Sequence, residues 1–261
     1  MASVNDSQIT DHSPIPIFPS PARHQSPIPT RMDTDDQKRA AGEAGASLAQ
    51  VGMVVGLGTG STATFLIETL IRRAAGGLKI KCIPTSERSA AQAKAGGLEI
   101  VTFATNKVIY LAIDGADEIK RDNLDLVKGL GGALLREKIV ASAAKRFVII
   151  ADDSKLVDWL GSHAPIPIEV TQFGWDLTAE RLRHEGAQIT QRQTAQGTPY
   201  LTDGGNFILD AKFEPIPDAA ALERRLLRIV GVVETGLFIG MAEQAMVASA
   251  QGVTRYTPRN G

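Results

Sequence analysis

The sequence predicts an α/β fold, with a large and mostly parallel sheet and a smaller α+β unit. Short apolar runs that end in turn residues or charges alternate with helical patterns from Asp35 to about residue 160, which is typical of buried strands joined by helices. One of these strands passes through a glycine-rich turn, Gly56–Thr62, directly into a helix. After His163 the order becomes strand, helix, strand, strand, helix, which fits a ferredoxin-like module.

Composition and charge exclude several classes of protein. The chain has 261 residues and a net charge of -1, so no overall field attracts nucleic acid or a membrane surface. No apolar run reaches the length of a membrane span. The single cysteine, Cys82, rules out an internal disulfide and suits a reducing, cytoplasmic compartment. The four histidines lack the spacing of metal ligands, so no metal is expected.

Residues 1–33 differ in composition from the rest of the chain. They are rich in Pro and Ser and lack periodicity, so we expect a disordered tail. The tail has no continuous apolar core of the signal-peptide kind, and a transit role is not favoured. Residues 34–163 and 233–261 are expected to form the large domain, and residues 164–232 the small one.

The first helix is predicted over Asp35–Gly52. Alanine-rich composition and acidic residues in the first turn favour it. Lys38 lies in that first turn, where the helix dipole slightly disfavours a cation. It is either a solvated surface lysine or a lysine directed at an anion.

A strand at Met53–Val55 then leads into the turn Gly56–Thr62 and an amphipathic helix. Backbone N–H groups and the positive end of the helix together form a cradle for an anion. Ser61 and Thr62 add hydroxyl donors to it. A tight turn without a ligand remains the alternative, because an isolated glycine motif is a weak signal.

The residues beyond the turn limit the identity of that anion. A Walker loop requires a lysine after Gly60, and none is present. A dinucleotide site favours an acidic residue at the end of the next strand, but Lys79–Ile83 ends in Pro84–Ser86. NAD is therefore disfavoured and a smaller phosphate is expected. A helix capped by Ser86 and a strand at Leu98–Phe103 come next.

The central stretch contains the most charge. Val108–Ile113 ends in the sequence DGADE, and Leu124–Val127 ends in Lys128. A glycine-rich loop then precedes a helical segment, Ala133–Ala141, that carries Glu137. Because ligands of open α/β sheets bind beyond the carboxyl ends of the strands, we expect these carboxylates and the lysine to form an acid/base site.

A charged loop after each strand explains any one of these features equally well. Their combination favours a site, because a solvated loop does not require Gly129, Gly131 and Gly132 beside a lysine. Glycines at that density allow the backbone to approach a ligand closely.

The next strand, Arg146–Ala151, also ends in charge, at Asp152–Lys155. Lys155 is either a second phosphate contact or part of the first turn of a short helix that continues to Leu160.

The small unit contains two helices, a hairpin around Asp203–Gly205 and a return strand, and a short helical and strand segment ends the chain. Its predicted elements are the helices Thr178–Glu185 and Ala219–Ile229 and the strands Gln188–Gln193, Tyr200–Thr202, Asn206–Phe213 and Gly231–Phe238.

Four motifs, in this order and at these spacings, resemble ribose-5-phosphate isomerase of the A type: GLGTGST, DGADEI, KGLGGALLREKIVAS and ADDSKLVDWLG. The resemblance extends from about Asp35 to the C-terminus and includes TDGGNFILD and GVVETGLF, while the tail lies outside it. One departure is Leu130, where the family often has glycine. Leucine is tolerable there if only its backbone meets the ligand.

The resemblance implies a Rossmann-like α/β domain with a smaller α+β domain, assembled as a homodimer or homotetramer, with no cofactor and no metal. It implies interconversion of D-ribose 5-phosphate and D-ribulose 5-phosphate in the pentose phosphate pathway. The phosphate would be held by Lys38, Thr59, Gly60, Ser61, Thr62 and Lys155. The sugar would be lined by Asp114, Gly115, Ala116, Asp117, Lys128, Gly129, Leu130 and Gly131. Glu137 would be the catalytic base.

The reaction itself indicates what these groups would do. One carboxylate, Glu137, can move the proton between C1 and C2 through a cis-enediolate. Lys128 and the N–H groups of residues 129–132 would stabilise its negative charge. Asp114 or Asp117 would move the hydroxyl proton and open the sugar ring, and the sequence does not decide between them.

Two other kinds of function fit less well. Sugar-phosphate sensor domains share this architecture, but they normally accompany a DNA-reading segment, and neither the Pro/Ser tail nor the net charge suits one. An amino-sugar phosphate isomerase or deaminase would be expected to place a histidine near the acids, and none lies between His24 and His163. The chain is short for a CoA-transferase-like protein.

Overall fold

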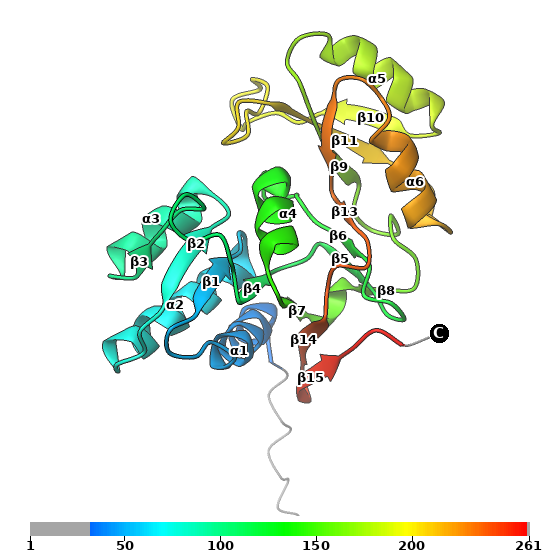
Figure 1. Cartoon of the computed structure of the whole chain (residues 1–261). Helices are drawn as coiled ribbons and strands as arrows, with labels where there is room; N and C mark the ends of the chain where they lie inside the picture. Colours follow the sequence, from blue (N-terminus) through cyan, green and yellow to red (C-terminus); the bar gives the residue numbers. More distant parts are fainter. Residues whose placement is uncertain (1–31, 260–261) are drawn as a thin grey trace, which may run out of the picture. The chain divides into compact units, whose positions relative to one another are not determined.

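The computed structural model describes residues 32–259, which cluster as one compact unit. The predicted disordered tail lies outside the described residues, except for its last two positions. The predicted α/β class is confirmed: the described part of the chain contains one large, mostly parallel sheet, and separate antiparallel strands form a smaller module (Figure 1).

The large sheet has the strand order β15-β14-β7-β4-β1-β2-β3. All neighbouring strands run parallel except the pair β14 and β15. The strands are β1 (Val54–Leu57), β2 (Lys81–Pro84), β3 (Glu99–Ile100), β4 (Leu111–Asp114), β7 (Phe147–Asp152), β14 (Gln244–Ser249) and β15 (Gly252–Tyr256).

Strand β1 lies inside this sheet, between β4 and β2. From β1 the chain builds outward in one direction through β2 and β3, and it then returns to build in the other direction through β4, β7 and β14. This is the Rossmann strand order, in which the reversal leaves a crevice between the carboxyl ends of β1 and β4. The topology therefore points to that crevice as the place for a ligand.

Helices cover both faces of the sheet, which explains why its strands are apolar on both sides. Side chains of β1 alternate between the faces: Val55 and Leu57 pack with α1 and α2, whereas Val54 packs with α4. The four helices that flank the large sheet are α1 (Thr34–Ser47), α2 (Ser61–Ala75), α3 (Glu87–Ala95) and α4 (Leu134–Ala143).

The small module has the sheet order β10-β11-β9-β12, and all neighbouring strands are antiparallel. With α5 between β9 and β10 and α6 between β11 and β12, this is the ferredoxin-like arrangement that was predicted. Its elements are β9 (Ile166–Val170), α5 (Trp175–His184), β10 (Gln188–Gln191), β11 (Phe207–Lys212), α6 (Ala219–Leu226) and β12 (Val232–Thr235). The division of the chain into domains remains a prediction.

A third sheet of short strands joins β13, β6, β5 and β8 in that order. It comprises β5 (Glu118–Lys120), β6 (Leu126–Val127), β8 (Leu156–Val157) and β13 (Leu237–Phe238). Of the two alternatives for Lys155, the short helix that continues to Leu160 is absent. A 3-10 turn at Asp153–Lys155 leads instead into β8, whose two side chains are buried and pair beside β5.

The other differences from prediction have tertiary causes. The expected helical segment near the C-terminus is absent from the described residues after α6; Gln244–Ser249 pairs with β7 instead, and burial in the sheet overrides the helix propensity of its alanines. β1 extends to Leu57, past the predicted strand end at Val55. Gly56 allows this because α4 packs closely against it: a Cβ at residue 56 would lie only 2.5 Å from Val140 Cγ1. α1 ends at Ser47 rather than Gly52.

In the described part of the chain, no helix combines the length and the apolar character that crossing a membrane requires.

Candidate functional site

The glycine turn after β1 and the acidic turn after β4 meet at the crevice. Gly58 N–H donates to Ile113 O over 2.9 Å, and Thr59 N–H donates to Asp114 Oδ1 over 3.0 Å. A Cβ on Gly58 would lie 2.1 Å from that same oxygen. Glycine at this position therefore allows the two strand ends to come together.

A cavity of about 130 Å³ opens at this point. It brings together nearly all the residues that the sequence singled out, from α1, both turns, the glycine loop, α4 and the turn after β7. Its walls are formed by Lys38, Thr59, Gly60, Ser61, Thr62, Gly115, Ala116, Asp117, Lys128, Gly129, Gly131, Glu137 and Lys155. Of the predicted set, only Asp114 and Leu130 do not line it.

One end of the cavity suits an anion. Gly60, with φ +121°, precedes α2, and no side chain caps the N-terminus of this helix. Its first N–H groups therefore present partial positive charge toward the cavity, next to Ser61 and Thr62. Lys38 and Lys155 line the same space. Lys38 Nζ also lies 3.4 Å from Asp35 Oδ1, an exposed carboxylate.

Thr59 supports this end of the cavity from beneath. Its hydroxyl lies 2.7 Å from Thr85 Oγ1 and 2.8 Å from Ser86 Oγ. Its N–H is already committed to Asp114. Thr59 therefore fixes the loop, and its hydroxyl is engaged in a buried network.

The other end of the cavity is an acid/base cluster around Lys128. Lys128 Nζ lies 3.0 Å from Asp114 Oδ2 and 3.4 Å from Glu137 Oε2, and it donates a 2.6 Å hydrogen bond to Gly115 O. The side chains of all three charged residues are only 2–3% exposed. Among the described residues, neither Asp114 Oδ2 nor Glu137 Oε2 accepts a well-oriented hydrogen bond, so each of these two oxygens keeps lone pairs that can accept one.

Burial alters proton affinity throughout this cluster. The pKa of Glu137 is raised to about 8: burial is the largest cause, Lys128 lowers it, and the neighbouring Asp114 and Asp117 carboxylates raise it. The pKa of Asp114 is also raised by burial, against the pull of Lys128. For Lys128 burial favours the neutral amine, but the surrounding carboxylates outweigh it and raise its pKa. Lys128 is thus a fixed cation.

Asp117 lines the cavity and is held by the glycine loop. Its Oδ2 accepts a 2.9 Å hydrogen bond from Leu130 N–H, and burial raises its pKa. The Leu130 side chain is 43% exposed and lies outside the cavity wall, so this residue reaches the site only through its backbone.

The glycine loop offers fewer donors than expected. We expected the N–H groups of residues 129–132 to stabilise negative charge, but Leu130 N–H is bound to Asp117 and Gly132 N–H to Gly129 O. Within residues 32–259, only the Gly129 and Gly131 N–H groups of this loop lack a protein acceptor. Lys128 is therefore the principal donor.

The sequence did not identify the residues of the small module that reach this site. Arg192, which follows β10, donates to the carbonyl oxygens of Gly129 and Leu130. Tyr200 lies so close to Gly132 that a Cβ there would be 2.2 Å from its hydroxyl oxygen. Both lie more than 60 residues from the loop, and no local motif marks them.

Residues 32–259 contain no group of three or more His, Cys, Asp or Glu side chains that could hold a metal ion. The two deeply buried carboxylates surround the Lys128 ammonium, which occupies the place that a cation would take between them.

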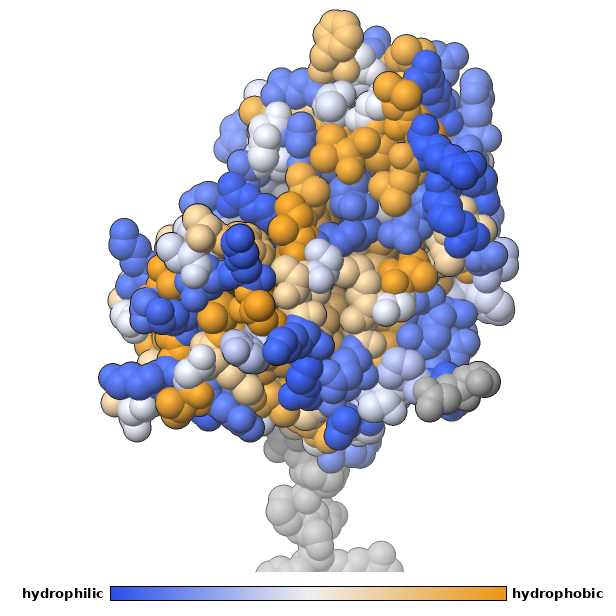
Figure 2. Space-filling view, in the orientation of Figure 1, coloured by the Kyte–Doolittle hydropathy of each residue, from blue (hydrophilic) through white to orange (hydrophobic). Residues whose placement is uncertain are grey.

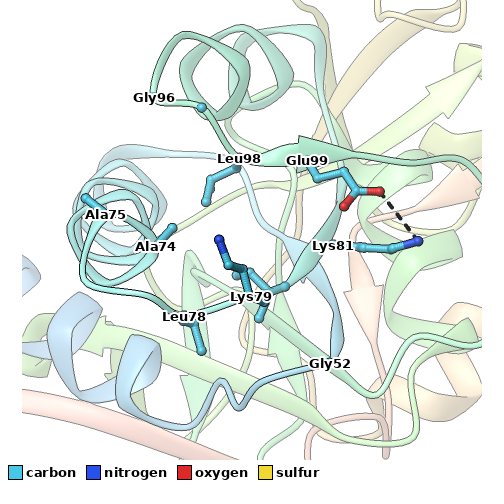
Figure 3. A pocket seen from close by; sticks show the side chains of 11 residues that line it. Gly52, Ala74, Ala75, Leu78, Lys79, Lys81, Gly96, Leu98 and Glu99 are labelled. Atoms are coloured by element: carbon cyan, nitrogen blue, oxygen red, sulfur yellow. Dashed lines mark ion pairs between the residues drawn. The ribbon is translucent and has the colours of Figure 1, made fainter.

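A larger hollow of about 480 Å³ lies at the opposite, amino end of the strands (Figure 3). Glycine, alanine and leucine line much of it, and its charged pair, Lys81 and Glu99, is exposed with 3.5 Å between Nζ and Oε1. It contains no buried titratable side chain, so the crevice beyond β1 and β4 is the better candidate for chemistry.

Comparisons with known proteins identify the family to which the chain is similar. Residues 81–252 match the family model of ribose 5-phosphate isomerase A (phosphoriboisomerase A). The chain is 51% identical over 227 residues to ribose-5-phosphate isomerase A of Gloeobacter violaceus, a match that covers 87% of this chain and 98% of the relative.

Two solved structures have the same fold. Ribose 5-phosphate isomerase A from Methanocaldococcus jannaschii superposes with a TM-score of 0.82 at 36% identity, covering 85% of this chain and 99% of the other. A D-ribose-5-phosphate isomerase in complex with phospho-erythronic acid superposes with a TM-score of 0.84 at 36% identity, covering 87% of this chain and 100% of the other.

Proposed function

The chain belongs to the ribose-5-phosphate isomerase A family, and on that premise we propose that it interconverts D-ribose 5-phosphate and D-ribulose 5-phosphate. The reaction belongs to the non-oxidative pentose phosphate pathway. One observation carries the proposal at the level of the site: a lysine-bridged pair of buried carboxylates and an uncapped helix N-terminus lie around one small cavity.

The substrate phosphate is assigned to the N-terminus of α2. Its free N–H groups, the hydroxyls of Ser61 and Thr62, and the ammonium groups of Lys38 and Lys155 together suit a dianion. Binding the phosphate at a distance from the reacting carbons orients the sugar and holds C1 and C2 against the acid/base cluster.

Glu137 is assigned as the base. Isomerisation moves one proton between C2 and C1, so a single group must accept the proton from one carbon and return it to the other. A carboxylate whose pKa is raised to about 8 is a stronger base than an ordinary glutamate and remains partly ionised near neutral pH. Its place in the first turn of α4 fixes it on a rigid element.

Lys128 is assigned to stabilise the enediolate. Its ammonium is fixed by Asp114, Glu137 and Gly115 O before any substrate binds, so the charge requires little reorganisation as the intermediate forms.

Asp117 is assigned to ring opening and to the hydroxyl proton, because it lines the cavity. Asp114 does not line it: its Oδ1 accepts from Thr59 and Gly115 N–H, and its Oδ2 faces Lys128. Asp114 thus orients Lys128 and the glycine turn.

The proposal is tested by replacing Glu137 with Gln and following ribulose 5-phosphate formation in a coupled assay. We expect kcat to fall by at least about 10²-fold, because a general base contributes that much, while calorimetry shows sugar-phosphate binding close to that of the wild type. Retention of more than about a tenth of the rate would remove Glu137 from this role.

Glu99→Gln is the matched control. It makes the same chemical change at the hollow in Figure 3, far from the crevice, and should leave kcat and KM unchanged. Wild-type protein that binds the sugar phosphate without converting it would instead favour the sensor-domain alternative.

We also propose that the enzyme is a cytoplasmic homodimer or homotetramer. Support comes from the family and from an apolar groove of about 540 Å³ beside α4, which includes the exposed Ile139. Figure 2 shows apolar side chains gathered around α4 on the same face. Light scattering after size-exclusion chromatography measures the oligomeric state.

Burial raises the pKa of Cys82 to about 12, so this thiol stays protonated and unreactive.

A further inference from the structure

Arg192 links the small module to the glycine loop. Its Nε donates to Asp210 Oδ2 over 2.9 Å, and its Nη2 contacts the other oxygen of the same carboxylate. Its Nη1 donates to Gly129 O over 2.9 Å and to Leu130 O over 3.1 Å. The side chain is 13% exposed, so this bidentate pair is largely shielded from water.

The geometry of the peptide bond gives these contacts a consequence at the site. Gly129 C=O and Leu130 N–H belong to one planar unit and point in opposite directions. Arg192 holds the oxygen of this unit, and Asp117 Oδ2 accepts from its nitrogen over 2.9 Å. The position of the guanidinium therefore fixes the direction of the N–H group that holds Asp117.

This peptide needs an external restraint. Gly129 has φ +104°, a conformation that glycine enters and leaves easily, so the sequence alone does not fix the unit. Neighbouring glycines at 131 and 132 add freedom on the other side. Within the loop the Gly129 oxygen accepts only from Gly132 N–H, over 3.0 Å, and the contacts from Arg192 to two successive carbonyl oxygens add the restraint from outside it.

We infer that Arg192, held by Asp210, is a positioning residue that fixes the 129–130 peptide and, through it, the Asp117 carboxylate. The inference rests on the proposed function, in which Asp117 moves the hydroxyl proton. Asp210 fixes the planar guanidinium of Arg192, and Nη1 of this guanidinium then donates to the carbonyl oxygens of Gly129 and Leu130. A lysine offers a single point charge and cannot reproduce that fork.

The positive charge of Arg192 also acts on Asp117 directly. Burial raises the pKa of that aspartate, and the loop N–H, Lys128, Lys155 and Arg192 each counteract the rise. Removal of the guanidinium should therefore raise the pKa of Asp117 further, whereas Arg192→Lys, which keeps the charge, should change it less.

The test compares Arg192→Met and Arg192→Lys with Arg225→Met. Arg225 also belongs to the small module and forms an ion pair with a carboxylate, with 2.8 Å between its Nε and Glu185 Oε2, but it does not contact the glycine loop. Each protein is assayed for kcat, for KM and for the pH dependence of kcat. Hydrogen exchange of the Leu130 amide is measured in the same samples without substrate.

For Arg192→Met we expect kcat to fall by up to about 10²-fold, because small displacements of catalytic groups cost that much. KM should change little, because the phosphate end is untouched. The pKa of Asp117 should rise and the Leu130 amide should exchange faster. Arg192→Lys should lose kcat with a smaller change in that pKa, and Arg225→Met should match the wild type.

Unchanged exchange at Leu130 in Arg192→Met would overturn the inference whether or not the chain is an isomerase. A loss that appears only in KM, or a rate within about twofold of the wild type, would also overturn it. A wild-type protein that does not convert ribose 5-phosphate would refute the proposed function alone, because amide exchange reports on the 129–130 peptide independently.

Discussion

At the scale of single residues, Lys128 determines the character of the site. One ammonium contacts two carboxylates and a carbonyl oxygen, and none of the three charged side chains is open to solvent. Burial of two carboxylates with one lysine leaves an excess of negative charge. Burial disfavours the ionised form of Glu137 most strongly, and the neighbouring Asp114 and Asp117 carboxylates add to this against Lys128, which is why the pKa of this residue lies far above that of an ordinary glutamate.

This pKa predicts a pH dependence with a definite sign. Only ionised Glu137 can accept a proton from carbon, and its pKa is raised to about 8. At pH 6 about 1% of the free enzyme would carry the ionised form, so kcat/KM should rise about tenfold per pH unit and level off above the pKa.

A profile of kcat/KM from pH 5.5 to 9.5 measures this dependence. The second ionisation of a phosphate ester lies near about pH 6, so a limb near 8 is separable from substrate titration. A profile that is flat between pH 6.5 and 8.5 would show that the base has an ordinary carboxylate pKa.

Some of the residues of the candidate site could be predicted from the sequence. Asp114, Asp117, Lys128 and Glu137 follow strands or begin a helix, so local pattern and the edge rule for α/β sheets brought them together. Arg192 could not be predicted, because its partners Gly129 and Leu130 are remote in sequence and backbone acceptors leave no mark on composition.

At the scale of elements, α4 links the large parallel sheet with the small module. Arg136 Nη1 lies 2.8 Å from Glu87 Oε1 and 3.4 Å from Asp203 Oδ2, at the hairpin of the small module. Two residues along, Lys138 Nζ lies 2.9 Å from Glu223 Oε1 and 2.7 Å from Glu234 Oε1. The turn of α4 that carries Glu137 is thus tied to the small module on both sides.

The close approach of the ends of β1 and β4 predicts the effect of replacing Gly58. Gly58→Ala should lower the free energy of unfolding by about 1–3 kcal/mol, because its Cβ would overlap Asp114. It should also lower kcat, because Asp114 orients Lys128. Urea unfolding and the coupled assay measure the two effects.

Gly76→Ala is the control for this substitution. Gly76 follows α2 with φ -81°, and the nearest atom to a Cβ there is Arg73 O at 3.4 Å, an ordinary contact. Its stability should be unchanged or higher by up to about 1 kcal/mol. Equal stability of Gly58→Ala and the wild type would contradict the close approach of the two strand ends.

Elements whose type follows from local pattern were predicted well, and some short strands that depend on remote pairing were missed. The helix that Ser86 caps begins as expected, with Ser86 Oγ accepting from Ser89 N–H over 3.1 Å. Strand β5 at Glu118–Lys120 was missed, because two acidic residues precede it and its burial depends on remote partners in β6 and β8. Glu118 is buried because its carboxylate accepts N–H groups of Gly161, His163 and Ala164.

At the scale of the whole described chain, the large sheet provides the crevice and the small module supports the loop beside it. The glycine turn proposed to hold the phosphate and Asp114 both lie at the strand reversal of the Rossmann order. Asp117, Lys128 and Glu137 lie in the long connection from β4 to β7, and Arg192 in the small module contacts their loop. A ferredoxin-like insertion with these contacts is therefore part of the proposed active site.

The architecture also predicts that activity does not depend on a metal ion. In the proposed mechanism Lys128 supplies the cationic charge that a Lewis acid would otherwise bring to the enediolate. Turnover should survive exhaustive EDTA treatment followed by gel filtration, with a Mg²⁺-dependent enzyme treated in parallel as the control. Loss of turnover that an added divalent cation restores would contradict this acid/base scheme.

The central claim is that one cavity holds a sugar phosphate by its phosphate at α2 and presents its other end to Glu137. A crystal structure of this protein with phospho-erythronic acid, the ligand in the complex of a similar isomerase, tests it most directly. We predict the phosphate against the N–H groups of Ser61 and Thr62, and the carboxylate end beside Lys128 and Glu137. A phosphate bound at Lys128, or a ligand that leaves the α2 terminus empty, would contradict the account.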